Sequence, residues 1–289
     1  MSLWTKVVNY HDELVADADP RAVTYPFMDS LVPNTVSIVA YLFIVLYAGP
    51  RFMRDRKPFD LKYVMILYNL FMVLFSAWMC YEFLVCGWLF DYSLTCQEVE
   101  FESTSPKQLR MVRVCYLYFL SKHIEFLDTF FFILRKKSNQ VTFLHVFHHS
   151  GMAYGWWFGA NFSAGGLGTF HAPINCLVHV MMYSYYGIAA MGPRFHKYIW
   201  WKKHLTSMQL IQFALTIGHL GNVMLFHNCR YPIGLKYLVL LNGSTLAALF
   251  VNFYRQTYIK KAQLKRDQQN GKALSGTNGH AAGKPLKGD

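Results

Sequence analysis

Charged residues are scarce in this chain. Only 15% of its 289 residues are Asp, Glu, Lys or Arg, whereas 54% are hydrophobic and 17% are aromatic. Soluble domains carry about 25% charged residues, because charged side chains cover much of their surface. So few charges with so much apolar surface exclude an ordinary water-soluble protein and indicate a membrane protein.

Several familiar motifs are also absent. The chain has no Gly-rich nucleotide loop, no Ser-centred elbow and no CxxC pair for a metal. Its first 32 residues include acidic side chains and lack the short apolar stretch of a cleavable signal peptide, so the first apolar span is expected to act as a signal anchor. With these motifs absent, the candidate functional residues are the polar side chains within the apolar segments.

Seven apolar segments are long enough, or nearly so, to cross a bilayer. They are residues 33–49, 64–87, 112–134, 141–160, 166–190, 205–226 and 233–257. Backbone groups in lipid must form their hydrogen bonds within their own segment, which favours helices. We therefore predict an all-α membrane protein with seven transmembrane helices in one bundle, formed by residues 1–258, and a disordered cytosolic tail over residues 259–289.

Positive charge is unevenly distributed between the two sides of this predicted bundle. Segments 50–63, 135–140, 191–204 and 255–289 lie on one side and hold 20 of the 28 lysines and arginines. The basic side is expected to be cytosolic, with the N-terminus outside and the C-terminus inside. The net charge of +12 then reflects topology and not nucleic-acid binding. Part of it forms a basic rim that should attract an anionic ligand. The rim comprises Arg135, Lys136, Lys137, Lys202 and Lys203.

Three histidines in the fourth segment form an HxxHH cluster. His145, His148 and His149 stand at positions i, i+3 and i+4, so they share one face of a helix. Ionisable side chains within a membrane span indicate a functional site. The spacing suits either metal binding or acyl chemistry.

Other polar residues lie at matching depths in three further segments. The third contains Lys122, Glu125 and Asp128, the fifth Asn175 and His179, and the sixth Gln209 and Gln212. At a rise of roughly 1.5 Å per residue, Asp128 is about 10 Å and His148 about 16 Å from the cytosolic boundary. We predict one polar layer built from four helices. Two simpler interpretations stay open: Lys122 and Glu125 as a charge-neutralising ion pair, and the glutamines as links between helices.

Four motifs resemble one known family. Residues 122–129 read KHIEFLDT, 143–149 FLHVFHH, 175–186 NCLVHVMMYSYY and 206–213 TSMQLIQF. In this order they resemble the very-long-chain fatty acid elongases, which are 3-ketoacyl-CoA synthases of the endoplasmic reticulum membrane. The runs AGGLGTFHA at 164–172 and WWKK at 200–203 resemble the branch that handles saturated and monounsaturated chains.

The resemblance implies a reaction and roles for the polar residues. An elongase condenses a long-chain acyl-CoA with malonyl-CoA to 3-ketoacyl-CoA, carbon dioxide and CoA, with its acyl chain in a tunnel between the helices. His148 is then the implied nucleophile that forms an acyl-imidazole, and His179 is its partner. His145 and His149 would orient the reacting groups, with Asp128 or Glu125 holding a ring N–H, and Asn175 would donate to a developing oxyanion.

Further expectations concern binding. Gln209, Gln212 and Tyr183, together with the basic rim, are expected to bind substrate. No bound cofactor or metal is expected, and malonyl-CoA and acyl-CoA enter as substrates. Membrane lipids, other enzymes of the elongation cycle and a second copy of the chain are the expected partners.

Two other classes of protein remain possible. A membrane di-iron desaturase or hydroxylase also uses HxxHH boxes, but such enzymes assemble about eight histidines, and this chain has no closely spaced histidine pair outside residues 145–149. A seven-helix receptor or transporter is the second class. Its ligand pocket would open outward, whereas the predicted polar layer lies in the cytosolic half.

The predicted topology has a consequence for the oxidation state of the cysteines. Cys96 and Cys229 both fall on the non-cytosolic side, where stable disulfides form, so we predict that they are bonded. The other four cysteines fall in or at the ends of apolar spans, where they should pack as small hydrophobic residues. The Asn161 sequon lies in a turn on the same side that is too short for us to expect a glycan.

Overall fold

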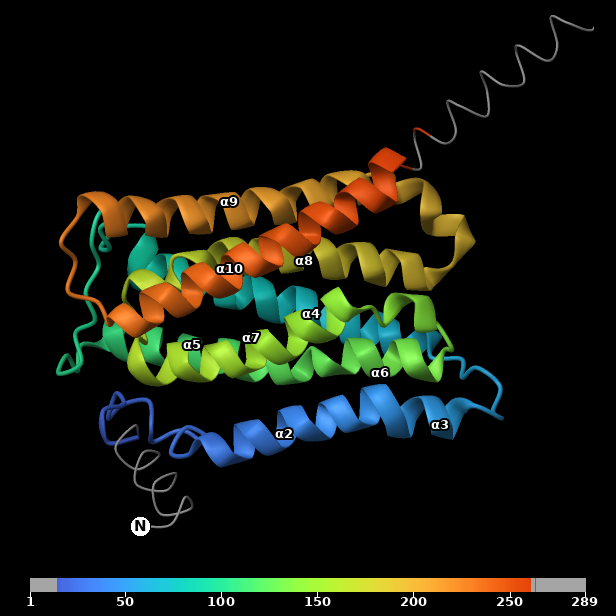
Figure 1. The fold of residues 1–289 in the computed structure, drawn as a ribbon, viewed down its shortest axis with the longest axis horizontal. Helices are drawn as coiled ribbons and strands as arrows, with labels where there is room; N and C mark the ends of the chain where they lie inside the picture. The colour runs from blue at the N-terminus through green and yellow to red at the C-terminus, as the bar shows by residue number, and fades with distance from the viewer. Residues whose placement is uncertain (1–14, 261–262, 264–289) are drawn as a thin grey trace, which may run out of the picture. The chain divides into compact units, whose positions relative to one another are not determined.

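The computed structural model describes residues 15–260 and Gln263, and these residues form helices and no strand. Figure 1 shows the elements, whose labels are kept below. They are α2 (Leu31–Phe43), η1 (Ile44–Ala48), α3 (Gly49–Met53), α4 (Lys62–Phe83), η2 (Leu84–Trp88), α5 (Pro106–Ile124), α6 (Phe126–Leu134), η3 (Ser138–Gln140), α7 (Phe143–Phe162), η4 (Leu167–Thr169), α8 (His171–Met191), η5 (Pro193–Tyr198), α9 (Lys202–Phe226), α10 (Ile233–Tyr254) and η6 (Arg255–Lys260).

The chain divides into two compact units, residues 1–247 and 248–289. The first contains the helices from α2 to α9 and residues 233–247 of α10. In the second, the end of α10 continues directly into the π-helical η6. Most of the predicted tail, residues 259–289, lies outside the described residues, so its disorder stays a prediction.

Four helical stretches are long and apolar enough to cross a membrane. They are Leu31–Met53, Lys62–Trp88, Lys202–Phe226 and Ile233–Lys260. Large apolar side chains on them point outward: Leu67, Leu225 and Leu241 are 67%, 77% and 71% exposed. Such exposure suits lipid contact, because lipid tails are as apolar as leucine. All seven predicted segments are largely helical. The helices α5, α7 and α8 are not among the four apolar stretches, because their polar side chains lower their hydropathy.

Local signals in the sequence set several helix ends. Ser105 accepts a hydrogen bond from the Gln108 backbone N–H, and Pro106 follows it at the first helical position of α5. Thr142 caps α7 in the same way through the His145 N–H, at 3.2 Å. Gly192 ends α8 with a φ of 112°, which favours glycine because a Cβ atom is strained there.

The third predicted span, residues 112–134, is not one continuous helix. The structure interrupts it at Glu125, between α5 and α6. Close to this position, the Ser121 hydroxyl donates to the Tyr118 carbonyl at 2.7 Å. The expectation of a regular helix was therefore wrong at the position that presents Glu125.

The helices of residues 1–247 pack in antiparallel fashion (Figure 1). Helix α4 contacts α5 and α8, α7 contacts α2 and α5, and α9 contacts α8. Their connections gather at two ends. At one end the Phe59 N–H donates to the Leu134 carbonyl, and at the other the Leu167 N–H donates to the Gln97 carbonyl. We call the first the rim end, since it carries the basic rim, and the second the disulfide end.

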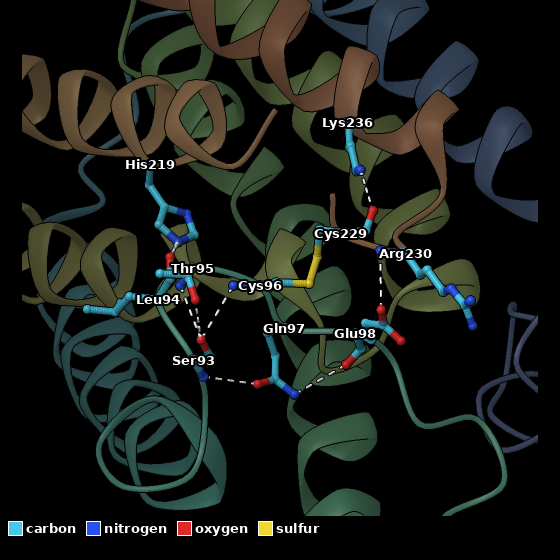
Figure 2. The surroundings of a disulfide bond; sticks show 10 residues. All are labelled: Ser93, Leu94, Thr95, Cys96, Gln97, Glu98, His219, Cys229, Arg230 and Lys236. Carbon is cyan, nitrogen blue, oxygen red and sulfur yellow. Dashed lines mark hydrogen bonds between the residues drawn. A yellow bond between two sulfur atoms is a disulfide. The ribbon is translucent and has the colours of Figure 1, made fainter. Parts of the chain in front are cut away.

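A disulfide joins Cys96 and Cys229, the pair predicted from topology, and Figure 2 shows its surroundings. The bond links the loop after η2 to the connection between α9 and α10. Next to it, the Arg230 N–H donates to a Glu98 carboxylate oxygen at 3.2 Å, and Lys236 Nζ donates to the Cys229 carbonyl at 2.8 Å. The disulfide end is therefore held by covalent and polar links together.

Candidate active site

The HxxHH histidines occupy one face of α7, and a hydrogen-bond chain fixes the first of them. His145 Nε2 lies 2.8 Å from the Thr129 hydroxyl of α6, which lies 2.9 Å from the Tyr41 hydroxyl of α2. The His145 and His149 rings are 4.3 Å apart between centroids, so the ring of His145 is held from two sides. His145 therefore faces α6 and α2.

His148 lines a cavity whose other lining residues come mainly from α7, α8, α9 and α10. Among the described residues it is the only histidine of the cluster that lines this space. Asn175 and Gln212 from two other helices line it as well. The remaining lining residues include the apolar side chains Met152, Trp156, Phe213, Leu235, Leu238, Val239 and Leu246. The His148 imidazole thus opens on a space that is mostly apolar.

Lys122, Glu125 and His179 form a buried charged group next to the histidine cluster's helix. Lys122 Nζ donates to Glu125 Oε1 at 2.7 Å, and both side chains are 2% exposed. The same oxygen lies 3.4 Å from His179 Nδ1. Lys122 also stands 4.1 Å above the Tyr118 ring, a favourable contact for a cation. The ion-pair interpretation of Lys122 and Glu125 is correct, but the carboxylate also reaches an imidazole.

Asn175 is held in one orientation by two neighbours. Its carbonyl oxygen accepts a hydrogen bond from the Tyr118 hydroxyl, and its Nδ2 donates to Gln212 Oε1 at 3.3 Å. All three side chains are buried. The amide is therefore preorganised, and Asn175 lines the same cavity as His148.

Several sequence-predicted residues have other neighbours than expected. Asp128 accepts a hydrogen bond from the Tyr183 hydroxyl at 2.8 Å, so this carboxylate meets a phenol and not a histidine ring. Gln209 Nε2 lies 4.0 Å from the sulfur of Met182. Neither Tyr183 nor Gln209 is among the residues that line the cavity, whereas Gln212 is.

The basic rim is mostly exposed. Lys136, Lys137, Lys202 and Lys203 are exposed and Arg135 is partly buried. Lys136 Nζ donates to the Arg54 carbonyl at 3.1 Å, which links two connections at this end. Most of the positive charge of the rim is therefore exposed to solvent, and none of the rim residues lines the cavity.

Sequence reasoning missed three contributors that hold the site and a fourth residue, His171, that lines the cavity. Tyr41, Tyr118 and Thr129 hold His145 and Asn175 but have no distinctive spacing, and only contacts between helices reveal them. His171 lines the cavity beside Trp156, with ring centroids 5.3 Å apart. His123 does have a structural partner, since its Nε2 lies 3.0 Å from Asn34 Oδ1.

The neighbours of the buried histidines differ from those of a metal site. Over residues 15–260 and Gln263, no three His, Cys, Asp or Glu side chains converge as a metal site requires. Instead, each buried imidazole with a described partner meets a hydroxyl, a carboxylate, an amide or another ring. The arrangement suits acid–base or nucleophilic chemistry by imidazole.

Comparison with known proteins shows the family of this chain. The model of the GNS1/SUR4 (ELO) family matches residues 26–266. The chain belongs to this family. Very long chain fatty acid elongase 7 of Rattus norvegicus is 49% identical over 275 residues, covering 94% of this chain and 97% of that protein.

Two further relatives agree. Very long chain fatty acid elongase 1 of Mus musculus is 48% identical over 268 residues, covering 92% of this chain and 95% of that protein. Very long chain fatty acid elongase 7 of Drosophila melanogaster is 43% identical over 271 residues, with shares of 94% and 82%. Both matches extend over nearly the whole chain, so they include the HxxHH helix and the cavity. Membership of the elongase family confirms the resemblance seen in the four motifs.

Proposed function

We propose that this member of the elongase family condenses a long-chain acyl-CoA with malonyl-CoA and that it does so through an acyl-imidazole on His148. The observation that carries the proposal is the position of His148, which alone of the three clustered histidines opens on the apolar cavity. An acyl chain needs an apolar space that begins at its reactive carbon. No other histidine of the cluster meets that requirement among the described residues.

The first step is transfer of the acyl group to the protein. A neutral His148 ring nitrogen attacks the thioester carbonyl, the imidazole proton passes to His179, the carbon–sulfur bond breaks and CoA leaves as a thiolate. An acyl-imidazole hydrolyses readily in water, so a buried apolar site protects it. In the second step malonyl-CoA loses carbon dioxide, and its enolate carbon attacks the acyl carbon. The imidazole is released and takes the proton back from His179 as 3-ketoacyl-CoA forms.

His179 and Glu125 assist this chemistry as a pair. The carboxylate lies 3.4 Å from His179 Nδ1, so it favours the tautomer that carries the proton on Nδ1 and leaves Nε2 as an acceptor. Lys122 neutralises the carboxylate, which allows the group to stay buried. His179 then acts as the proton acceptor at the reacting thioester, and Glu125 orients it.

Asn175 stabilises developing negative charge. Its amide is fixed by Tyr118 and Gln212, so the N–H group needs no reorientation when charge appears on a carbonyl or enolate oxygen. Donors fixed before the reaction are worth far more in a dry site than in water. The same contacts give Gln212 a binding role. Gln209 and Tyr183 would contribute by supporting the layer and not by touching the acyl chain.

The remaining elements of the proposal concern the setting. The chain would cross the endoplasmic reticulum membrane seven times, with a lumenal N-terminus and a cytosolic C-terminus. Support for this arrangement comes from the alternation of the helix connections between the rim end and the disulfide end. CoA phosphates would meet the basic rim from the cytosol. Membrane lipids, other enzymes of the elongation cycle and a second copy of the chain are the proposed partners.

Intact-mass measurement tests the mechanism. Purified protein mixed with acyl-CoA alone should gain the mass of one acyl group, and addition of malonyl-CoA should remove that mass as 3-ketoacyl-CoA appears. His148→Ala should abolish both adduct and product, and His179→Ala should severely lower the rate of product formation. His196→Ala is the matched control, because His196 is exposed at the rim end and far from the cluster in sequence.

The metal alternative makes the opposite prediction. A metal-dependent oxidative enzyme would contain stoichiometric iron, would lose activity with a chelator and would form no acyl adduct. Such a result would overturn the acyl-imidazole mechanism. A His148→Ala protein that still forms the adduct would move the nucleophile to another residue.

A further inference from the structure

A second group of cations lies at the rim end, on and beside the connection between α3 and α4. It comprises Arg51, Arg54, Arg56, Lys57 and Lys62, and all five residues are exposed. We call this group the α3–α4 patch. None of its residues lines the cavity that His148 lines. The reaction proposed above therefore does not use them.

The positive charge of the α3–α4 patch is not neutralised locally. Residues 51–62 contain five cationic side chains and two carboxylates, which leaves a net charge of +3. Among the described residues, only one patch cation is paired with a carboxylate: Arg54 Nε lies 3.3 Å from Asp55 Oδ2, with the side chains 69% and 82% exposed. Such exposed pairs are weak. The other carboxylate, Asp60, accepts the Lys62 backbone N–H at 3.1 Å. Most of the charge therefore remains available to an anionic ligand.

The patch lies where a connection meets the membrane surface. It falls at the junction of Leu31–Met53 and Lys62–Trp88, two of the stretches that are long and apolar enough to cross a bilayer. Phe52, Phe59 and Tyr63 stand between the cations and are 49%, 44% and 75% exposed. Exposed aromatic rings next to basic side chains are typical of the headgroup level of a membrane. The cations should therefore lie at the same level as lipid phosphates.

Local contacts hold the patch in one shape. The Arg56 guanidinium lies 4.0 Å above the centre of the Phe52 ring, and its Nε donates to the Phe52 carbonyl at 3.1 Å. Further along, the Phe59 N–H donates to the Leu134 carbonyl at 3.0 Å, which attaches the connection to the end of α6. Binding to side chains on an ordered connection costs less conformational entropy than binding to a mobile loop.

We propose that the α3–α4 patch binds the headgroup phosphate of an anionic phospholipid. Four to eight basic side chains next to a membrane span are enough to attract such lipids. CoA carries similar phosphate groups, but no patch residue lines the cavity that would hold its acyl chain, and exposed aromatic rings surround the patch. The inference rests on the proposed membrane setting and not on the chemistry of His148.

The experiment compares two phospholipids on the full-length protein. Protein purified in a neutral detergent is mixed with equal amounts of phosphatidylinositol and phosphatidylcholine, and native mass spectrometry counts the lipids that stay bound. The parent should retain phosphatidylinositol severalfold over phosphatidylcholine, and added salt should lower this ratio. The combined substitution Arg54→Gln, Arg56→Gln and Lys57→Gln should bring the ratio close to one.

A matched control removes the same number of charges at the same end. Lys197, Lys202 and Lys203 are exposed on and beside the connection between α8 and α9, and their replacement by Gln should leave the lipid ratio unchanged. Michaelis constants distinguish the two sources of phosphate. The control variant should raise KM for acyl-CoA at low salt, whereas the patch variant should keep the parent KM.

The outcomes separate this inference from the proposed function. Equal retention of both lipids by the parent, or an unchanged ratio in the patch variant, overturns the inference. A patch variant that keeps the ratio and raises KM assigns these cations to CoA instead. If the parent forms no 3-ketoacyl-CoA, the proposed function fails, yet loss of the lipid ratio in the patch variant still supports the inference. Should the patch variant not fold, Lys57→Glu decides, because an unchanged ratio after reversal of that exposed charge overturns the inference.

Discussion

The buried polar layer and the basic rim both carry charge, yet they hold it in opposite ways. In the layer, Lys122 and Glu125 are 2% exposed and each charged atom has a defined partner on its own or a neighbouring helix. At the rim, Lys137 and Lys202 are exposed to solvent. Fixed charge in a site without water can stabilise the charge that develops in a transition state. Solvated charge mainly changes how fast a charged ligand associates with the protein.

This contrast predicts that loss of one buried charge has the largest effect. Lys122→Met leaves the Glu125 carboxylate buried without its counter-charge, which should cost about 3–5 kcal/mol of stability. Lys107→Met is the matched control, since Lys107 and Asp91 form an ion pair that is 55% and 44% exposed and worth less than about 1 kcal/mol. Thermal unfolding in detergent gives both values.

A double substitution separates stability from catalysis. Lys122→Met with Glu125→Gln removes both charges, so the unfolding temperature should recover most of the loss. Product formation should stay low, because His179 has then lost its carboxylate partner. Full recovery of activity in the double variant would show that the pair is only structural.

Thr129→Val should have an intermediate effect. It removes the hydroxyl between His145 and Tyr41 and leaves two buried polar atoms without partners, at a cost of about 1–3 kcal/mol. If that cost falls on the reacting geometry, kcat drops roughly tenfold while KM is unchanged. Thr129→Ser keeps the hydroxyl and should restore kcat. A Thr129→Val protein that keeps the parent kcat would show that this hydrogen bond is not needed for the reaction.

The rim should give the smallest effect. Replacing Lys136, Lys137, Lys202 and Lys203 by Gln removes solvated charges, so KM for acyl-CoA should rise severalfold at low salt with little change in kcat. The difference from the parent should shrink as salt is added. Lys107→Gln, on the opposite connection, is the control. Variants that match the parent at low salt would reduce the rim to a marker of membrane orientation.

The fold could be predicted largely from the sequence because lipid imposes a simple rule. Each apolar segment must be a helix to pair its own backbone groups, so seven segments predicted the positions of the helices to within a few residues. The break at Glu125 escaped that rule. Residue 125 lies between α5 and α6, and hydropathy does not register such a local change of backbone geometry.

The residues of the candidate site could be predicted in part from the sequence. Polar residues are costly in apolar spans, so His145, His148, His149, Glu125 and His179 stood out by type and depth alone. Their shared helix face made the three clustered histidines look equivalent. Packing distinguishes them, because His145 meets Thr129 while His148 opens on the cavity.

The sequence by itself determined which segments are apolar enough to form long helices, which connections carry the positive charge and which residues bring polar chemistry into an apolar region, since each of these follows from residue type and position along the chain. Only the tertiary structure decided which polar groups touch and which side chains line the cavity. Tyr41, Tyr118 and Thr129 are ordinary residues in the sequence, and they gain a role only because helices distant in the chain bring them against His145 and Asn175. Contacts of that kind depend on how side chains from different helices fill a shared space, which no single segment encodes.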